Sequence, residues 1–209
     1  MSLRLLKRPI SLASRPEISQ FRLQSGLAQL NNDLTSFPSR WFADLQAQLK
    51  HFTSDHYPAS CVQEAKRQLV SNEENWLQLL AGQQGFLTDK KWRGLDNHQL
   101  LWGDMDSMPL EFPDHITVLY KLLEAPTNES TSLKMEAWIL SEQYRRLAAR
   151  CIDDTVIYEY TTAKKTVLKP FMVDKFQQTF SMQQANQRKY TDQAKRAIQE
   201  AEELQMKYK

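Results

Sequence analysis

Three runs of alternating apolar and polar residues between positions 116 and 160 constrain the fold of this chain more than any other feature. Side chains alternate between the two faces of a sheet, so a period of two predicts half-buried strands. The third run, 147–160, is long for one strand, and Asp153 and Asp154 predict a bulge or bend within it. Short polar turns at 125–131 and 142–146 join the runs and predict an antiparallel meander. The apolar positions of the first two runs are Ile116, Val118, Tyr120, Leu122, Leu133, Met135, Ala137 and Ile139.

Upstream of this meander, the apolar spacing changes to that of helices. It predicts one helix over 38–52, capped by Ser39, and a second near 59–70. Asn72, followed by two glutamates, predicts the start of a third helix, which ends near Gly82. We interpret these short helices as a packing or docking region.

Residues 173–207 predict one long helix or two. An apolar start at Val173, Phe176 and Phe180 is suited to packing on the sheet, whereas the stretch 183–193 is too polar to bury. A narrow stripe follows that is typical of a helix with a partner helix, the alternative being a solvated, partly frayed tail. The stripe consists of Ala194, Ala197, Ile198, Ala201 and Leu204.

The first 30 residues are basic and rich in serine. They hold five Lys or Arg and a single acid, Glu17. This pattern is typical of a mitochondrial transit segment, although Pro9 and Pro16 interrupt any helix there, and the alternative is an ordinary basic, disordered tail. We therefore assign residues 1–35 as a transit or disordered segment and predict a mitochondrial location.

The composition excludes several classes of function. A net charge of +2 is too small and too dispersed for nucleic-acid binding, and no apolar run has the length of a membrane span. Two distant cysteines and four histidines without HxxxH spacing predict no metal site and no disulfide framework. No glycine follows Gly103, which argues against phosphate-binding loops. We expect no cofactor.

Two stretches resemble the hotdog-fold acyl-CoA thioesterases of the 4-hydroxybenzoyl-CoA thioesterase type, in the form found in fungal mitochondria. The first is LLWGDMDSM at 100–108. The second begins with FPDHITVLY at 112–120 and continues through LSEQYRRLAARC at 140–151 to TVIYEY at 155–160. The resemblance excludes the upstream helices and the C-terminal tail.

The resemblance implies an α+β fold in which an antiparallel sheet wraps a long central helix, usually in a dimer. It also implies that a first strand, near 99–106, ends at the Asp-x-Asp pair and that acyl-CoA is the substrate. Asp106 takes the catalytic position, as a nucleophile on the thioester or as a base on water, and Asp104 shares its face of the strand.

The sequence departs from the family after Met108. It runs directly into Pro109 and Pro113, so no residues remain for the glycine turn or the central helix. The central helix is therefore missing or replaced, and the upstream helices and the C-terminal tail are the candidate replacements. Without a replacement, one face of the sheet stays uncovered, which predicts an incompletely covered core and poor two-state unfolding.

Among the other candidates, Arg145, Arg146 and Arg150 are either phosphate contacts for coenzyme A or a solvated turn. His115 is expected to be a capping or surface residue, and Cys151 a buried small side chain. The aromatic side chains Trp138, Tyr158 and Tyr160 are expected to be packing residues.

These interpretations divide the chain into a helical region at 36–98, a truncated hotdog domain at 99–171 and a helical tail at 172–209. The leading hypothesis is acyl-CoA thioester hydrolysis, impaired by the missing segment. The alternative is a non-catalytic hotdog scaffold of a mitochondrial assembly. Either way, we expect a homo-oligomer or a protein complex, no nucleic acid and no membrane span.

Overall fold

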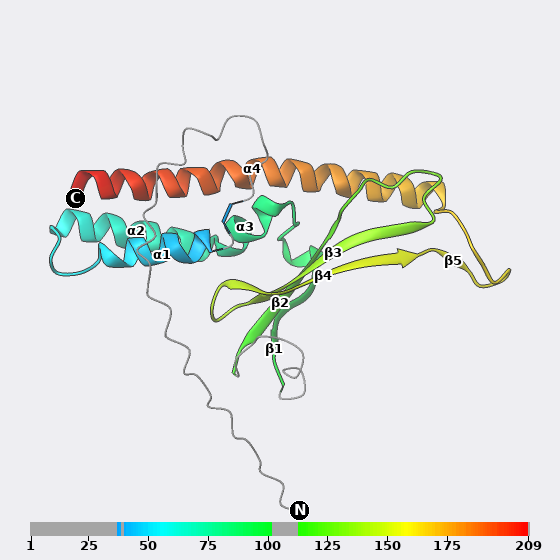
Figure 1. The fold of residues 1–209 in the computed structure, drawn as a ribbon, viewed down its shortest axis with the longest axis horizontal. Coiled ribbons are helices and arrows are strands. Elements are labelled where there is room, and N and C mark those ends of the chain that lie inside the picture. Colours follow the sequence, from blue (N-terminus) through cyan, green and yellow to red (C-terminus); the bar gives the residue numbers. More distant parts are fainter. Residues whose placement is uncertain (1–36, 39, 102–112, 209) are drawn as a thin grey trace, which may run out of the picture. The chain divides into compact units, whose positions relative to one another are not determined.

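The computed structural model describes residues 37–38, 40–101 and 113–208. The expected transit segment at 1–35 lies outside the described residues, as do Asp104 and Asp106. The described chain is α+β, with short helices that precede a four-stranded antiparallel sheet in the sequence and a long C-terminal helix that follows it (Figure 1). This confirms the coarse fold class.

The sheet has the strand order β1-β2-β3-β4, all antiparallel. Its strands are β1 (Arg93–Gln99), β2 (His115–Leu122), β3 (Ser132–Ser141) and β4 (Arg146–Val156). Strands β2 to β4 confirm the predicted meander. A small hairpin of β5 (Tyr158–Glu159) and β6 (Lys164–Lys165) follows.

The irregularity of the third predicted strand lies elsewhere than expected. Asp153 and Asp154 stay in regular register, opposite Met135 and Lys134. The register shifts instead between Ile139 and Leu140, where the β4 strand contains one extra residue. Polar side chains on an exposed strand therefore did not mark the bulge, which lies close to the turn that ends β3.

Strand β1 lies within the region predicted to be helical, upstream of the expected 99–106. Its sequence, RGLDNHQ, has no alternating apolar pattern, and nearly all of it is exposed. Pairing with β2 therefore defines this strand. A Cβ atom on Gly94 would clash with the ring of Tyr120 on β2, so glycine at this position leaves room for that ring beside β1.

Three helices precede the sheet: α1 (Trp41–His51), α2 (Ala59–Glu74) and α3 (Trp76–Leu80). The prediction that a helix starts at Asn72 was wrong, because Asn72 is buried within α2. The break comes at Asn75, whose backbone and side-chain nitrogens both donate to the carbonyl of Ser71. Short 3-10 turns, η2 (Gly82–Gln84) and η3 (Lys90–Trp92), lead into β1.

The C-terminal region is a single helix, α4 (Pro170–Tyr208). Its C-terminal half runs along α1 and α2, and its N-terminal half extends over the strands (Figure 1). The partner of its apolar stripe is therefore this chain's own helix pair, and Ala194, Ala201 and Leu204 are buried there. The stretch 183–193 was predicted to be too polar to bury, yet Gln183 is buried. None of the described helices combines the length and apolar character that crossing a membrane requires.

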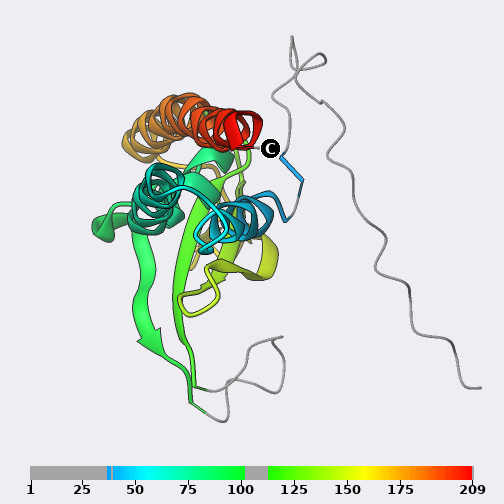
Figure 2. The ribbon, with the colours of Figure 1, turned by 90° about the vertical axis from the view of Figure 1, so that its left-hand side faces the viewer.

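One apolar core joins the helices to the sheet. Figure 2 shows α1, α2 and α4 gathered at one end of the strands. From the sheet, Leu119, Trp138 and Leu140 enter the same buried cluster as residues of all four helices. The start of α4 forms a second cluster with strand ends, through Val173, as its apolar pattern predicted. The helices therefore cover the sheet face that carries Trp138.

Candidate functional site

The connection that carries Asp104 and Asp106 joins β1 to β2, two adjacent strands of the sheet. Both aspartates lie outside the described residues, but both ends of the connection are described. The backbone N–H of Leu100 donates to the carbonyl of Asp114 at 3.0 Å, and Gln99 lies opposite His115. The Asp-x-Asp pair thus belongs to the link between β1 and β2.

A buried carboxylate fixes the downstream end of this link. Asp114 is 2% exposed, and its Oδ2 accepts a hydrogen bond from the hydroxyl of Ser141. Its Oδ1 accepts from the backbone N–H groups of His115 at 2.7 Å and Gln143 at 3.1 Å. The bonds to Ser141 and Gln143 therefore tie the downstream end of the link to the turn between β3 and β4.

A buried apolar cluster includes the upstream end of the same link. Leu100, Ile116 and Val118 form a buried cluster on the sheet, against which Ile139 and Ala148 pack. In the register of the sheet, Ile116 and Val118 alternate with Leu119, so they occupy the face opposite the helix-covered one. The described end of the link at Leu100 is thus part of a buried apolar cluster on the second face of the sheet.

On the helix-covered face, Glu136 is the centre of a charged network. Its carboxylate accepts from Trp138 Nε1 at 2.7 Å and lies 3.1 Å from Lys121 Nζ, with Arg150 Nε as a third partner. Burial by itself raises the pKa of Glu136, but these hydrogen bonds and the Lys121 charge outweigh it, so the pKa is lowered. A carboxylate held ionised in this way stabilises the fold and is a poor general base.

The three arginines near the β3–β4 turn do not form one open cationic site. Arg145 pairs with Glu73 of α2 at 2.9 Å, and Arg150 pairs with Glu136. The guanidinium of Arg146 lies 5.5 Å from the ring centroid of Tyr144. A pocket of about 410 Å³ lies beneath this turn, lined by Phe42, Ala43, Gln46, Ala47, Lys50, Glu73, Gln143, Tyr144 and Arg145.

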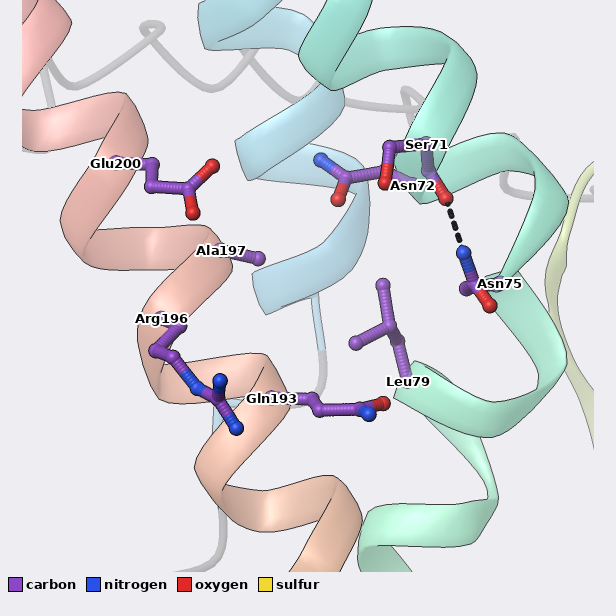
Figure 3. A pocket seen from close by; sticks show the side chains of 8 residues that line it. All are labelled: Ser71, Asn72, Asn75, Leu79, Gln193, Arg196, Ala197 and Glu200. Carbon is purple, nitrogen blue, oxygen red and sulfur yellow. Dashed lines mark hydrogen bonds between the residues drawn. The ribbon is translucent and has the colours of Figure 1, made fainter.

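A second pocket, of about 240 Å³, lies between α2–α3 and α4 (Figure 3). Asn72, 6% exposed, and Gln193 of α4 extend into it from opposite sides, while Arg196 and Glu200 follow along α4. These amide and charged groups hydrogen-bond polar ligands. Sequence reasoning missed the pocket because its residues come from segments 100 or more positions apart, and their polarity indicated only solvent exposure.

The remaining candidates divide between confirmed and wrong predictions. His115 is exposed at the start of β2, and Trp138 is buried, as predicted. Cys151 is exposed, not buried. Tyr158 and Tyr160 contact each other but are 46% and 88% exposed, so they are not core residues. Among the described residues, no group of three or more His, Cys, Asp or Glu is placed to hold a metal ion.

Comparisons of this chain with protein-family models, with curated proteins and with solved structures found no match.

Proposed function

We propose that this chain acts on acyl-CoA thioesters, with Asp106 as nucleophile or base. The observation that supports this best is that the link carrying Asp104 and Asp106 starts at Leu100 and ends at Asp114, next to a buried apolar cluster of the sheet. A link that carries carboxylates and starts among apolar side chains is suited to a substrate with a polar reacting group and an alkyl chain. The resemblance to hotdog-fold thioesterases at residues 100–120 and 140–160 points to the same substrate class.

Two routes of hydrolysis are open to Asp106. In one route, its carboxylate attacks the thioester carbonyl and displaces the thiolate of coenzyme A, and water then hydrolyses the resulting acyl–aspartyl anhydride. In the other, it removes a proton from the water that attacks the thioester carbonyl, and the thiolate leaves. Asp104 lies two residues away in the sequence, so a second carboxylate is available for proton transfer. In such a pair, one carboxyl group can carry the proton while the other stays ionised.

The test is hydrolysis of saturated acyl-CoAs of several chain lengths by the full chain, measured through the free thiol of the coenzyme A that is released. We expect Asp106→Asn to reduce kcat/KM roughly 100-fold or more, the usual contribution of a catalytic base. Asp153→Asn, which removes an exposed carboxylate on β4, is the matched control and should leave the rate unchanged. Equal rates for wild type and Asp106→Asn would refute the role of Asp106.

A second candidate is a non-catalytic scaffold in a mitochondrial assembly. It is favoured by the arginine pairs, since Arg145 and Arg150 are both neutralised by carboxylates of this chain. It predicts no hydrolysis of any acyl-CoA and sedimentation of the endogenous protein as part of a larger complex. Sedimentation of the free chain alone would contradict it.

Mitochondrial import directed by residues 1–35 belongs to both candidates. A fusion of these residues to a fluorescent protein should enter mitochondria, and the same fusion with the five basic residues replaced by Gln should not. Entry of both fusions, or of neither, would contradict an import signal of this kind.

A further inference from the structure

Strand β4 presents an open sheet edge. It is the last strand in the sheet order, and within the described residues no strand pairs with its outer side. Residues 150 to 156 are all exposed, and Ile152 is 59% exposed. An exposed edge of this length, with an apolar side chain at its centre, is a template for pairing with another strand.

The hydrogen bonds to β3 determine which residues of β4 face outward. The N–H of Ile157 donates to the carbonyl of Thr131 at 2.9 Å, directly beyond the last ladder pair. Because hydrogen-bonded and non-bonded positions alternate in an antiparallel pair, the odd-numbered residues 151 to 155 bond to β3. The backbone N–H and C=O groups that point away from the sheet therefore belong to Arg150, Ile152, Asp154 and Val156.

We propose that this edge pairs with the same edge of a second copy of this chain, antiparallel, with Ile152 opposite the partner's Ile152. A two-fold axis through this pair makes the two sheets continuous. Arg150 then lies opposite the partner's Asp154, and Asp154 opposite the partner's Arg150. Directly opposed, oppositely charged side chains stabilise an antiparallel pair, so the strand is complementary to itself in charge as well as in hydrogen bonding.

The neighbouring registers lack this complementarity. Moving the partner strand by two residues in one direction puts Asp153 opposite the partner's Asp153, which is repulsive. A shift in the other direction puts Cys151 opposite the partner's Cys151 and leaves Arg150 facing an isoleucine. Intermediate shifts place outward-pointing groups opposite inward-pointing ones and lose the ladder.

The Arg150 side chain is able to make this contact. Its Nε is bound to Glu136, and the side chain is 55% exposed. The bond to Glu136 fixes the guanidinium beside the strand, so less rotamer entropy is lost when its terminal nitrogens meet a second carboxylate. This proposal does not depend on the proposed hydrolysis, because it uses no residue assigned to catalysis.

Sedimentation velocity of the full chain over a range of concentrations tests the proposal. The wild type should be in a monomer–dimer equilibrium. Asp154→Arg replaces two attractive pairs by two repulsive ones and should raise the dimer dissociation constant roughly tenfold or more. Asp153→Arg makes the same charge change on the same strand, but its side chain lies on the other sheet face and not opposite the partner's Arg150. This control should change the dimer dissociation constant far less.

A mixing experiment tests the register. Asp154→Arg and Arg150→Asp chains should each dimerise weakly, whereas an equal mixture should form a heterodimer in which both opposed pairs are again attractive. A monomeric wild type would overturn the proposal. So would a wild-type dimer that Asp154→Arg leaves intact, or that Asp153→Arg weakens equally. Where Arg150→Asp fails to fold by circular dichroism, the comparison of the two aspartate variants decides.

Discussion

At the scale of single residues, Glu136 shows how this fold holds a charge inside. The residue is 3% exposed, and an unpaired carboxylate there would be strongly destabilising. Three donors surround it, and Lys121 has a second partner in the carbonyl of Gln84 at 2.8 Å. Lys121 also lies 4.8 Å from the ring centroid of Phe86, so one cation links the sheet to the segment before β1. Removal of the Glu136 charge therefore leaves the largely buried Lys121 ammonium without its carboxylate partner.

We expect Glu136→Gln to lower the free energy of unfolding by about 3 kcal/mol at pH 7, the usual cost of breaking a buried ion pair. Because folding lowers the pKa of Glu136, its ionised form stabilises the fold above the ordinary value of 4.5, and this contribution is lost as the pH falls below it. The difference between variant and wild type should therefore shrink in acid. Urea unfolding at pH 7 and at acid pH measures both effects.

Glu124→Gln is the matched control for this change. Glu124 pairs with Lys134 at 3.5 Å, but both side chains are at least half exposed, so the loss should be below about 0.5 kcal/mol at either pH. Equal losses for Glu124→Gln and Glu136→Gln would show that burial does not strengthen the Glu136 network.

At the scale of elements, α4 is held against the rest of the chain by a close approach at Gly82. A Cβ atom on this residue of η2 would lie 2.5 Å from a ring carbon of Tyr190 on α4. The amide of Asn186 adds a hydrogen bond to the carbonyl of Phe86 at 3.2 Å. Absence of a side chain at one position thus allows the middle of α4 to contact the segment before the sheet.

We expect Gly82→Ala to destabilise the protein by about 1–3 kcal/mol, because the added methyl group clashes with the Tyr190 ring. In a Tyr190→Ala background, the same substitution should be nearly neutral, since the clashing ring is gone. A double-mutant cycle of thermal unfolding measures the coupling. Equal effects of Gly82→Ala in both backgrounds would show that the clash is not its cause.

At the scale of the whole described chain, the helices and the sheet share one core. The sequence predicted an incompletely covered core and poor two-state unfolding, because the family's central helix has no counterpart. In the structure, α1 to α4 cover one sheet face, and Trp41, Trp76 and Trp138 belong to the same cluster. We therefore expect tryptophan fluorescence and far-ultraviolet circular dichroism to report one transition for the wild type.

The Ala201→Asp variant tests whether this core is shared. Ala201 of α4 is fully buried, so a carboxylate there should cost at least about 3 kcal/mol and loosen the packing around Trp138 on the sheet as well. The control is Gln199→Asp, at an exposed position of the same helix turn, with little expected effect. An Ala201→Asp protein whose fluorescence transition coincides with that of the wild type would contradict a single core.

Local pattern determined much of this structure. The alternation at 116–139 was enough to place β2 and β3, because an antiparallel meander needs only period-two runs and short turns. The apolar stripe of α4 identified its buried face but not its partner, since α1 and α2 are more than 100 residues away. For the candidate site, the sequence supplied the Asp-x-Asp pair, and the structure added the hydrogen bonds of Asp114 at the end of its link and the buried apolar cluster that includes Leu100.

What the sequence determined by itself was therefore the class of each element with a repeated apolar pattern, because that pattern acts between neighbours along the chain. Tertiary structure alone decided β1, the burial of Glu136 and Gln183, and the exposure of Cys151. Strand β1 has no pattern of its own and exists because β2 supplies its hydrogen bonds. Glu136 lies inside because Lys121, Trp138 and Arg150 of three different strands surround its carboxylate. Each of these outcomes depends on contacts between distant segments, which local sequence does not encode.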